Sequence, residues 1–197
     1  MEKLFFAIWF RLDQKDRYLI WIQDESDQVL VETDVLIPVF NSETALANYA
    51  GKKLIEIVNE EPLFCNLDYI SNWIIQPDNS IDCQMFLSTW NLFMDIASGI
   101  NRPFTGNKKD KLTNKVYDKI FYGNNLPSVT PEGKYYIPVW TKSERQRLME
   151  IMSEGIALLR RNLKEIDLIT IQFSIVSLVW LYTSKTGKDT PCVKISS

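Results

Sequence analysis

Over the first 60 residues, apolar side chains either run without interruption or alternate with polar ones, and both patterns are typical of β-strands. Residues 3–12 are apolar on both faces, as expected of a central strand, and residues 18–22 form a second apolar run. Shorter runs follow at 29–31, 35–40 and 55–58. Because a polar cluster of turn-forming residues joins the second and third runs, the pattern predicts a mostly antiparallel sheet.

The pattern then changes to the 3.6-residue spacing of helices. Helices are predicted at 42–50, 66–76, 80–100 and 111–122. Asn41 or Ser42 can cap the first helix, and Gly51 is expected to end it because glycine readily adopts the left-handed conformation that terminates helices. The helix over 80–100 has apolar residues on most of its sides, so we expect it to be buried.

A later strand and a long amphipathic helix are predicted beyond residue 134. Residues 135–140 have the composition of a strand, and Thr141-x-x-Glu144 is a capping box, in which each side chain satisfies an unpaired backbone N–H of the first turn. The helix that it opens carries a stripe of Leu148, Ile151, Met152, Leu159 and Leu163. The order Ile-Pro-Val-aromatic followed by Ser-Glu occurs at 37–43 and again at 137–144, which indicates either a duplicated strand-to-helix unit or two independent junctions of one kind.

The chain is expected to be an α+β protein: an N-terminal, mostly antiparallel sheet packed by a helical middle, then a later strand and a long amphipathic helix. We expect a single domain over 1–183, with a sub-boundary near 101–110, followed by a polar tail over 184–197. Residues 168–183 carry no charge and are shorter than a comfortable membrane span. Their alternation favours a half-buried strand; a buried helix and peripheral attachment to a membrane are the alternatives.

The chain has no histidine, which removes the Ser-His-Asp and Cys-His catalytic arrangements and the His-containing zinc sites from consideration. Its three cysteines, Cys65, Cys83 and Cys192, are widely spaced, which indicates neither a disulfide framework nor a zinc site and favours a reducing compartment. The apolar N-terminal run lacks a basic leader and is interrupted by Arg11, so we interpret it as a strand and not as a signal peptide. These features predict a cytoplasmic protein without a metal, a cofactor or catalytic residues.

The charge balance gives no general attraction to phosphate backbones or anionic lipid, since 25 acidic residues stand against 22 basic ones and the net charge is −3. Nucleic acid is therefore not an expected partner, and a membrane is an unfavoured one. The carboxylates of Asp24, Glu25 and Asp27 could hold a cation, but they lack EF-hand spacing. A solvated hairpin turn explains this cluster better.

Residues 35–50, Val-Leu-Ile-Pro-Val-Phe-Asn-Ser-Glu-Thr-Ala-Leu-Ala-Asn-Tyr-Ala, resemble the strand and helix of SseB-type proteins, a bacterial group found around secretion systems. The resemblance implies a bacterial α+β module that acts through protein contacts and is not an enzyme. No catalytic residues carry over, because the matching motif is structural.

The loop over 122–133, with the segment 134–136 that follows it, is the candidate contact surface. It is about as long as loops become without a function, and it combines rigid prolines with amides and tyrosines, as contact surfaces do. The candidate binding residues are Tyr122, Asn124, Asn125, Thr130, Glu132 and Tyr135. The alternative is a pinned connection between a helix and a strand, with its tyrosines packed inward.

These observations predict a protein that binds another protein, as an immunity-type inhibitor or a secretion accessory, with self-association left open. A mildly acidic surface suits a basic partner such as a nuclease toxin. The alternative class is a carboxylate-dependent enzyme or a small-ligand-binding protein, which a deep cleft with convergent carboxylates of perturbed ionisation would favour. A filled core with an exposed apolar patch would favour the protein binder.

Overall fold

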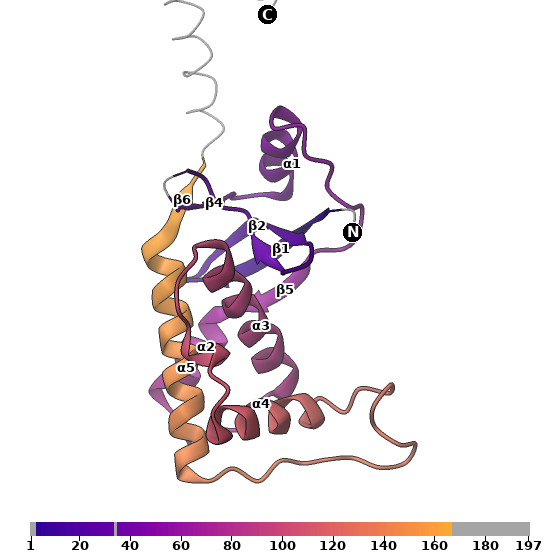
Figure 1. Cartoon of the computed structure of the whole chain (residues 1–197), viewed down its shortest axis with the longest axis vertical. Helices are drawn as coiled ribbons and strands as arrows, with labels where there is room; N and C mark the ends of the chain where they lie inside the picture. The colour runs from indigo at the N-terminus through magenta and orange to yellow at the C-terminus, as the bar shows by residue number, and fades with distance from the viewer. Residues whose placement is uncertain (1–2, 34, 167–197) are drawn as a thin grey trace, which may run out of the picture. The chain divides into compact units, whose positions relative to one another are not determined.

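The computed structural model describes residues 3–33 and 35–166. The chain forms an N-terminal sheet at the positions expected from the sequence (Figure 1). Strands β1 (Leu4–Leu12) and β2 (Lys15–Gln23) pair antiparallel along their whole length. Asp13 and Gln14 form the two-residue turn between them, both with positive φ, as tight hairpins require.

Two short strands complete this sheet, whose order is β3-β2-β1-β5. Strand β3 (Gln28–Val29) pairs antiparallel with β2 at one edge, and β5 (Leu63–Asn66) pairs parallel with β1 at the other. The sheet is therefore mixed, with mostly antiparallel pairing. The predicted strand over 55–58 is reduced to an isolated bridge between Ile57 and Phe5.

A second, two-stranded sheet joins β4 (Ile37–Val39) in parallel to β6 (Leu163–Glu165). Arg17 of β2 connects it to the main sheet, since its guanidinium donates to the Leu12 carbonyl at 2.8 Å and pairs with the Glu165 carboxylate at 2.8 Å. Strand β6 brings a segment from the end of the described chain beside one from its beginning.

The helices cover both faces of the main sheet. They are α1 (Glu43–Lys52), α2 (Leu67–Ile75), α3 (Cys83–Gly99), α4 (Lys111–Gly123) and α5 (Lys142–Asn162), with a 3-10 turn at Thr105–Asn107. Helix α1 lies on one side of the sheet and α2 to α5 gather on the other (Figure 1). The residues up to Glu165 form one compact unit, and its fold is α+β.

Helix α3 is at the centre of the core, as its apolar pattern predicts. Phe86, Trp90, Phe93 and Ile96 are completely buried, and the helix contacts β3, β5, α4 and α5. Helix α5 approaches closely at Gly155, where a Cβ atom would overlap the Phe93 ring. Small residues at helix crossings allow such an approach.

Most predicted helix starts are confirmed by side-chain caps. Ser42, Asn66 and Asp110 each accept a hydrogen bond from a first-turn N–H, and Thr141 and Glu144 form the complete capping box. The helix predicted from residue 80 begins at Cys83 instead, with Asp82 as its N-cap. These starts depend on local hydrogen bonds, which sequence patterns report well.

Several expectations are corrected. Helix α1 continues through Gly51 to Lys52, and Leu54 takes the left-handed conformation instead. Leu163 belongs to β6 and not to the helix stripe.

Residues 135–140 are not a strand, because no neighbouring strand within the described chain pairs with them. The similarity of 37–43 to 137–144 is therefore not a repeated strand-to-helix unit. Residues 168–183, with the expected domain end and tail, lie outside the described residues. Within 3–33 and 35–166, no helix is both long and apolar enough to span a membrane.

We predict that Gly155→Ala lowers the free energy of unfolding by about 1–3 kcal/mol, because the added methyl group overpacks the buried Phe93 ring. Urea denaturation measures the change. Gly51→Ala is the matched control: apart from its chain neighbours and its own helix backbone, no atom lies within 4 Å of the added Cβ, and the helical position gains roughly 0.5–1 kcal/mol. Equal effects of the two substitutions would contradict the close packing of α5 on α3.

Candidate functional site

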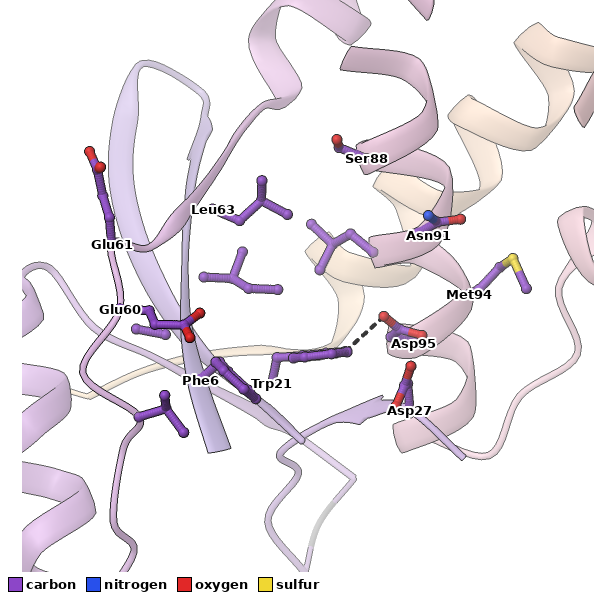
Figure 2. Close-up of a pocket in the computed structure, with 14 residues that line it drawn as sticks. Phe6, Trp21, Asp27, Glu60, Glu61, Leu63, Ser88, Asn91, Met94 and Asp95 are labelled. Atoms are coloured by element: carbon purple, nitrogen blue, oxygen red, sulfur yellow. Dashed lines mark hydrogen bonds between the residues drawn. The ribbon is translucent and has the colours of Figure 1, made fainter. Parts of the chain in front are cut away.

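An acid-lined cleft of about 520 Å³ opens between the sheet and α3 (Figure 2). Its floor is apolar and its rim carries carboxylates. The apolar lining includes Phe6, Ala7, Ile8, Trp21, Val58, Leu63, Leu92 and Met94, and the polar lining is Asp27, Glu60, Glu61, Ser88, Asn91 and Asp95. We call this the acidic cleft.

A bulge in the sheet creates this cleft. Phe5 of β1 is bridged to Ile57, and Ile8 of β1 pairs with Leu63. An advance of three residues along β1 therefore lies opposite an advance of six residues along the neighbouring segment. The surplus residues loop away from β1 and leave the sheet open beside Phe6 and Ala7. Bulges of this kind redirect side chains at sheet edges. Here Glu60 and Glu61 line the sheet side of the cleft, and the Glu61 side chain points away from α3 (Figure 2).

Asp95 of α3 is the most perturbed carboxyl group of the cleft. Its Oδ2 accepts a hydrogen bond of 2.8 Å from Nε1 of Trp21, a residue of β2 (Figure 2). Burial raises the pKa of Asp95 to about 6; the Trp21 hydrogen bond opposes the rise and the nearby charge of Asp27 adds to it. The Asp95 carboxyl group therefore changes from its neutral to its ionised form just below neutral pH.

The cleft has one sign of charge. It contains four carboxyl groups, and no lysine or arginine is among its lining residues. No three carboxylates or cysteines in the described part of the chain converge as metal ligands do. The acidic groups are spread along the cleft, so the complementary ligand is a cationic group attached to an apolar body.

The predicted contact loop is a second surface, and its base is closed by hydrogen bonds. The Asn125 side chain donates to the Tyr136 carbonyl at 3.1 Å and accepts from the Tyr136 N–H at 2.7 Å. This amide therefore pairs with the backbone as a neighbouring strand would. Asn125 itself has a positive φ of 51°, a conformation that asparagine tolerates well.

A buried ion cluster fixes the end of the loop. Glu144, only 1% exposed, pairs with Lys119 at 2.7 Å and Lys115 at 2.9 Å, both on α4. Lys119 also donates to the Val139 carbonyl at 2.5 Å and lies over the Trp140 ring. Burial by itself would raise the pKa of Glu144, but hydrogen bonds from Lys119, the Thr141 N–H and Lys115 outweigh it and lower the pKa to about 2.

The structure does not bring the six predicted binding residues together. Tyr122 lies at the end of α4 and its ring contacts Tyr136, while Asn124 is the C-cap of that helix. Asn125, as described above, holds the base of the loop.

The remaining three belong to the loop itself. The Thr130 N–H folds back onto the Leu126 carbonyl at 2.9 Å, and Glu132 is exposed in the following turn. Tyr135 is 83% exposed, so it does not pack inward. The loop is a held, solvent-facing surface with several exposed apolar side chains.

Sequence reasoning missed the acidic cleft. Asp95 was the available signal, because a single carboxylate in a helix expected to be buried on most sides needs a structural reason. Nothing local connects it with Asp27 or Glu60, which lie 68 and 35 residues earlier. The local sequence around Asp27 indicates a solvated turn, with cation binding as the alternative, and not a cleft.

Comparisons with known proteins give little. No family model and no curated protein matches the chain. A solved structure described as the C-terminal domain of SatS in complex with bromine is similar, with 14% sequence identity and a TM-score of 0.49. The similarity covers 82% of this chain and 94% of that one, and at this level it carries no functional argument.

We predict that Asp95→Asn gains stability over the parent as pH rises. The folded-state pKa of Asp95 is raised to about 6 from an ordinary 3.8, so the ionised group destabilises the fold above about pH 6 and ceases to do so below about pH 4. After allowance for solvent screening, the advantage of asparagine should grow by about 1–2 kcal/mol between pH 4 and pH 7. Urea denaturation at several pH values measures it. A difference that does not change with pH would contradict the buried position of Asp95.

We predict that Glu144→Gln lowers the free energy of unfolding by about 2–4 kcal/mol at pH 7, because it leaves Lys119 without its buried partner. Since the folded-state pKa is lowered, the Glu144 contribution is present above about pH 4.5 and is lost as pH falls toward 2, so the deficit should shrink there. Proteolysis within 126–135 should also accelerate. Glu150→Gln, a half-exposed control on the same helix, should cost less than about 1 kcal/mol.

Proposed function

We propose that the protein is a non-catalytic protein-binding protein, and that its acidic cleft receives a basic, apolar segment of the partner. The observation that carries the proposal is the combination of an aromatic and aliphatic floor with four carboxylates and no basic residue in one cleft. An apolar side chain of the partner would be buried against Phe6 and Trp21. A neighbouring lysine or arginine would meet Asp95 and the rim.

The spread of the carboxylates supports a polypeptide over a point-like ligand. Asp27 follows β2, Glu60 and Glu61 belong to the bulge, and Asp95 is on α3, so the charges come from three separate segments. A segment with two or more basic residues can satisfy several of them at once. Electrostatic attraction of this kind speeds encounter and selects partners more than it adds affinity.

A basic partner is in keeping with an immunity-type inhibitor or a secretion accessory. The resemblance of residues 35–50 to SseB-type proteins supports a bacterial protein that acts through such contacts. In this proposal the protein neutralises or accompanies a basic protein and performs no chemistry on it.

The second candidate is a small-ligand-binding protein or a carboxylate-dependent enzyme that takes an organic cation. The specific observation in its favour is the pKa of Asp95, which burial raises to about 6, where a carboxyl group can accept or donate a proton near neutral pH. An aryl-alkyl amine would place its ring against Trp21 and its ammonium group near Asp95.

We predict that a peptide of alternating lysine and leucine or phenylalanine residues binds the protein, and that the double variant Glu60→Gln/Glu61→Gln weakens binding roughly tenfold at low salt. Isothermal titration calorimetry measures both affinities. Asp118→Asn removes one exposed carboxylate of α4, outside the cleft, and should leave the affinity nearly unchanged.

Two outcomes would contradict this proposal. Equal weakening by the cleft and α4 variants would indicate nonspecific attraction to the acidic protein. Tight binding of an aryl-alkyl amine with no binding of the peptide would favour the second candidate. In that case, Asp95→Asn should abolish binding of the amine.

A further inference from the structure

The return branch of the loop, Tyr135–Val139, has the alternation of a strand but no strand beside it in the described part of the chain. Three side chains point to solvent: Tyr135, Ile137 and Val139 are 83%, 82% and 81% exposed. Pro138, between them, is half-buried, and its ring lies beside Gly123 at the end of α4. The branch runs from the loop toward the start of α5 (Figure 1).

One edge of this segment is covered by the protein itself. Both backbone groups of Tyr136 bond to the Asn125 side chain. Because successive residues of an extended chain direct their backbone groups to opposite edges, the N–H and C=O groups of Tyr135 and Ile137 belong to the other edge. They have no hydrogen-bond partner among the residues that the structure describes. Pro138, which lacks an N–H, belongs to the covered edge and so does not interrupt the open one.

We propose that this open edge, Tyr135–Val139, pairs antiparallel with the same segment of a second copy of the chain, about a twofold axis at Ile137. The two Ile137 residues would exchange both of their backbone hydrogen bonds. Tyr135 would lie opposite Val139 of the other copy, an aromatic and β-branched pair of the kind that stabilises antiparallel strands. The Val139 carbonyl already accepts from Lys119, but a carbonyl has a second lone pair.

The residues beside the segment fit this symmetric register. Pairing about Ile137 places Lys134 across from Trp140, so a cation and an aromatic ring face each other. No like charges are opposed over 134–140. A twofold interface must be complementary to itself, and this segment meets that requirement.

The anchors of the loop make the pairing feasible, and the short length of the paired segment limits the affinity of the dimer. Asn125 and Lys119 hold the segment extended before association, which lowers the entropy that pairing would cost. A ribbon of five residues from each copy is small beside ordinary stable interfaces. The dimer should therefore form reversibly and depend on protein concentration. It uses no residue of the acidic cleft, so it is independent of the proposed function.

Sedimentation velocity over a series of protein concentrations tests the proposal. The parent chain should shift from monomer to dimer as its concentration rises. Ile137→Pro removes the central N–H from the open edge in both copies and should weaken the dimer at least about tenfold. Leu54→Asn is the matched control: Leu54 is 94% exposed elsewhere and has a positive φ that asparagine tolerates, so dimerisation should be retained.

Disulfide trapping tests the register independently of any loss of stability. In a Cys192→Ser background, in which Cys65 and Cys83 are buried, Ile137→Cys should form a cross-linked dimer under mild oxidation. Tyr135→Cys should not, because each residue 135 faces residue 139 of the other copy. A chain that stays monomeric at all concentrations, or a dimer unaffected by Ile137→Pro, would overturn the proposal. Equal trapping at 135 and 137 would overturn the register.

Discussion

The constraint on which the rest of this structure depends is the burial of α3. Most of its aromatic and aliphatic side chains are buried, because β3, β5, α4 and α5 pack around it and Trp73 of α2 contacts its Phe86 ring. The fit is tight enough that α5 needs a glycine where it meets Phe93. Asp95 is the one carboxylate on this helix, and the cover is incomplete there. The acidic cleft is thus the place where the core cannot close over a carboxylate.

The bulge beside β1 determines what that opening presents. The segment from Ile57 to Leu63 meets β1 at Phe5 and again at Ile8 but does not pair with it between these points, and the cleft lies beside this interruption. The surplus residues carry Glu60 and Glu61 to the sheet side of the cleft. Low-dielectric walls strengthen the effect of these charges on any cation that enters. Shape and electrostatics therefore have the same origin, which is a local mismatch in strand pairing.

The loop over 126–135 is held by hydrogen bonds and ion pairs near both of its ends. Asn125 replaces a strand partner at one end, and the Glu144 cluster holds Lys119 against the Val139 carbonyl at the other. Rigid prolines lie between these anchors. Such a segment presents exposed apolar side chains in a defined geometry. Its surface shares no residue with the acidic cleft, so the two can serve different contacts.

The amino-acid sequence by itself determined the features that depend on neighbours along the chain: the β1–β2 hairpin, the helix caps at Ser42 and Asn66, and the capping box of α5. Only the tertiary structure decided whether a strand-like pattern finds a partner. Residues 135–140 do not find one within the described chain, whereas β6 pairs with β4 from far away. The cleft and the Glu144 cluster likewise join distant segments. The physical reason is that caps and periodicity are short-range, while pairing, burial and pKa depend on which distant groups the fold brings together.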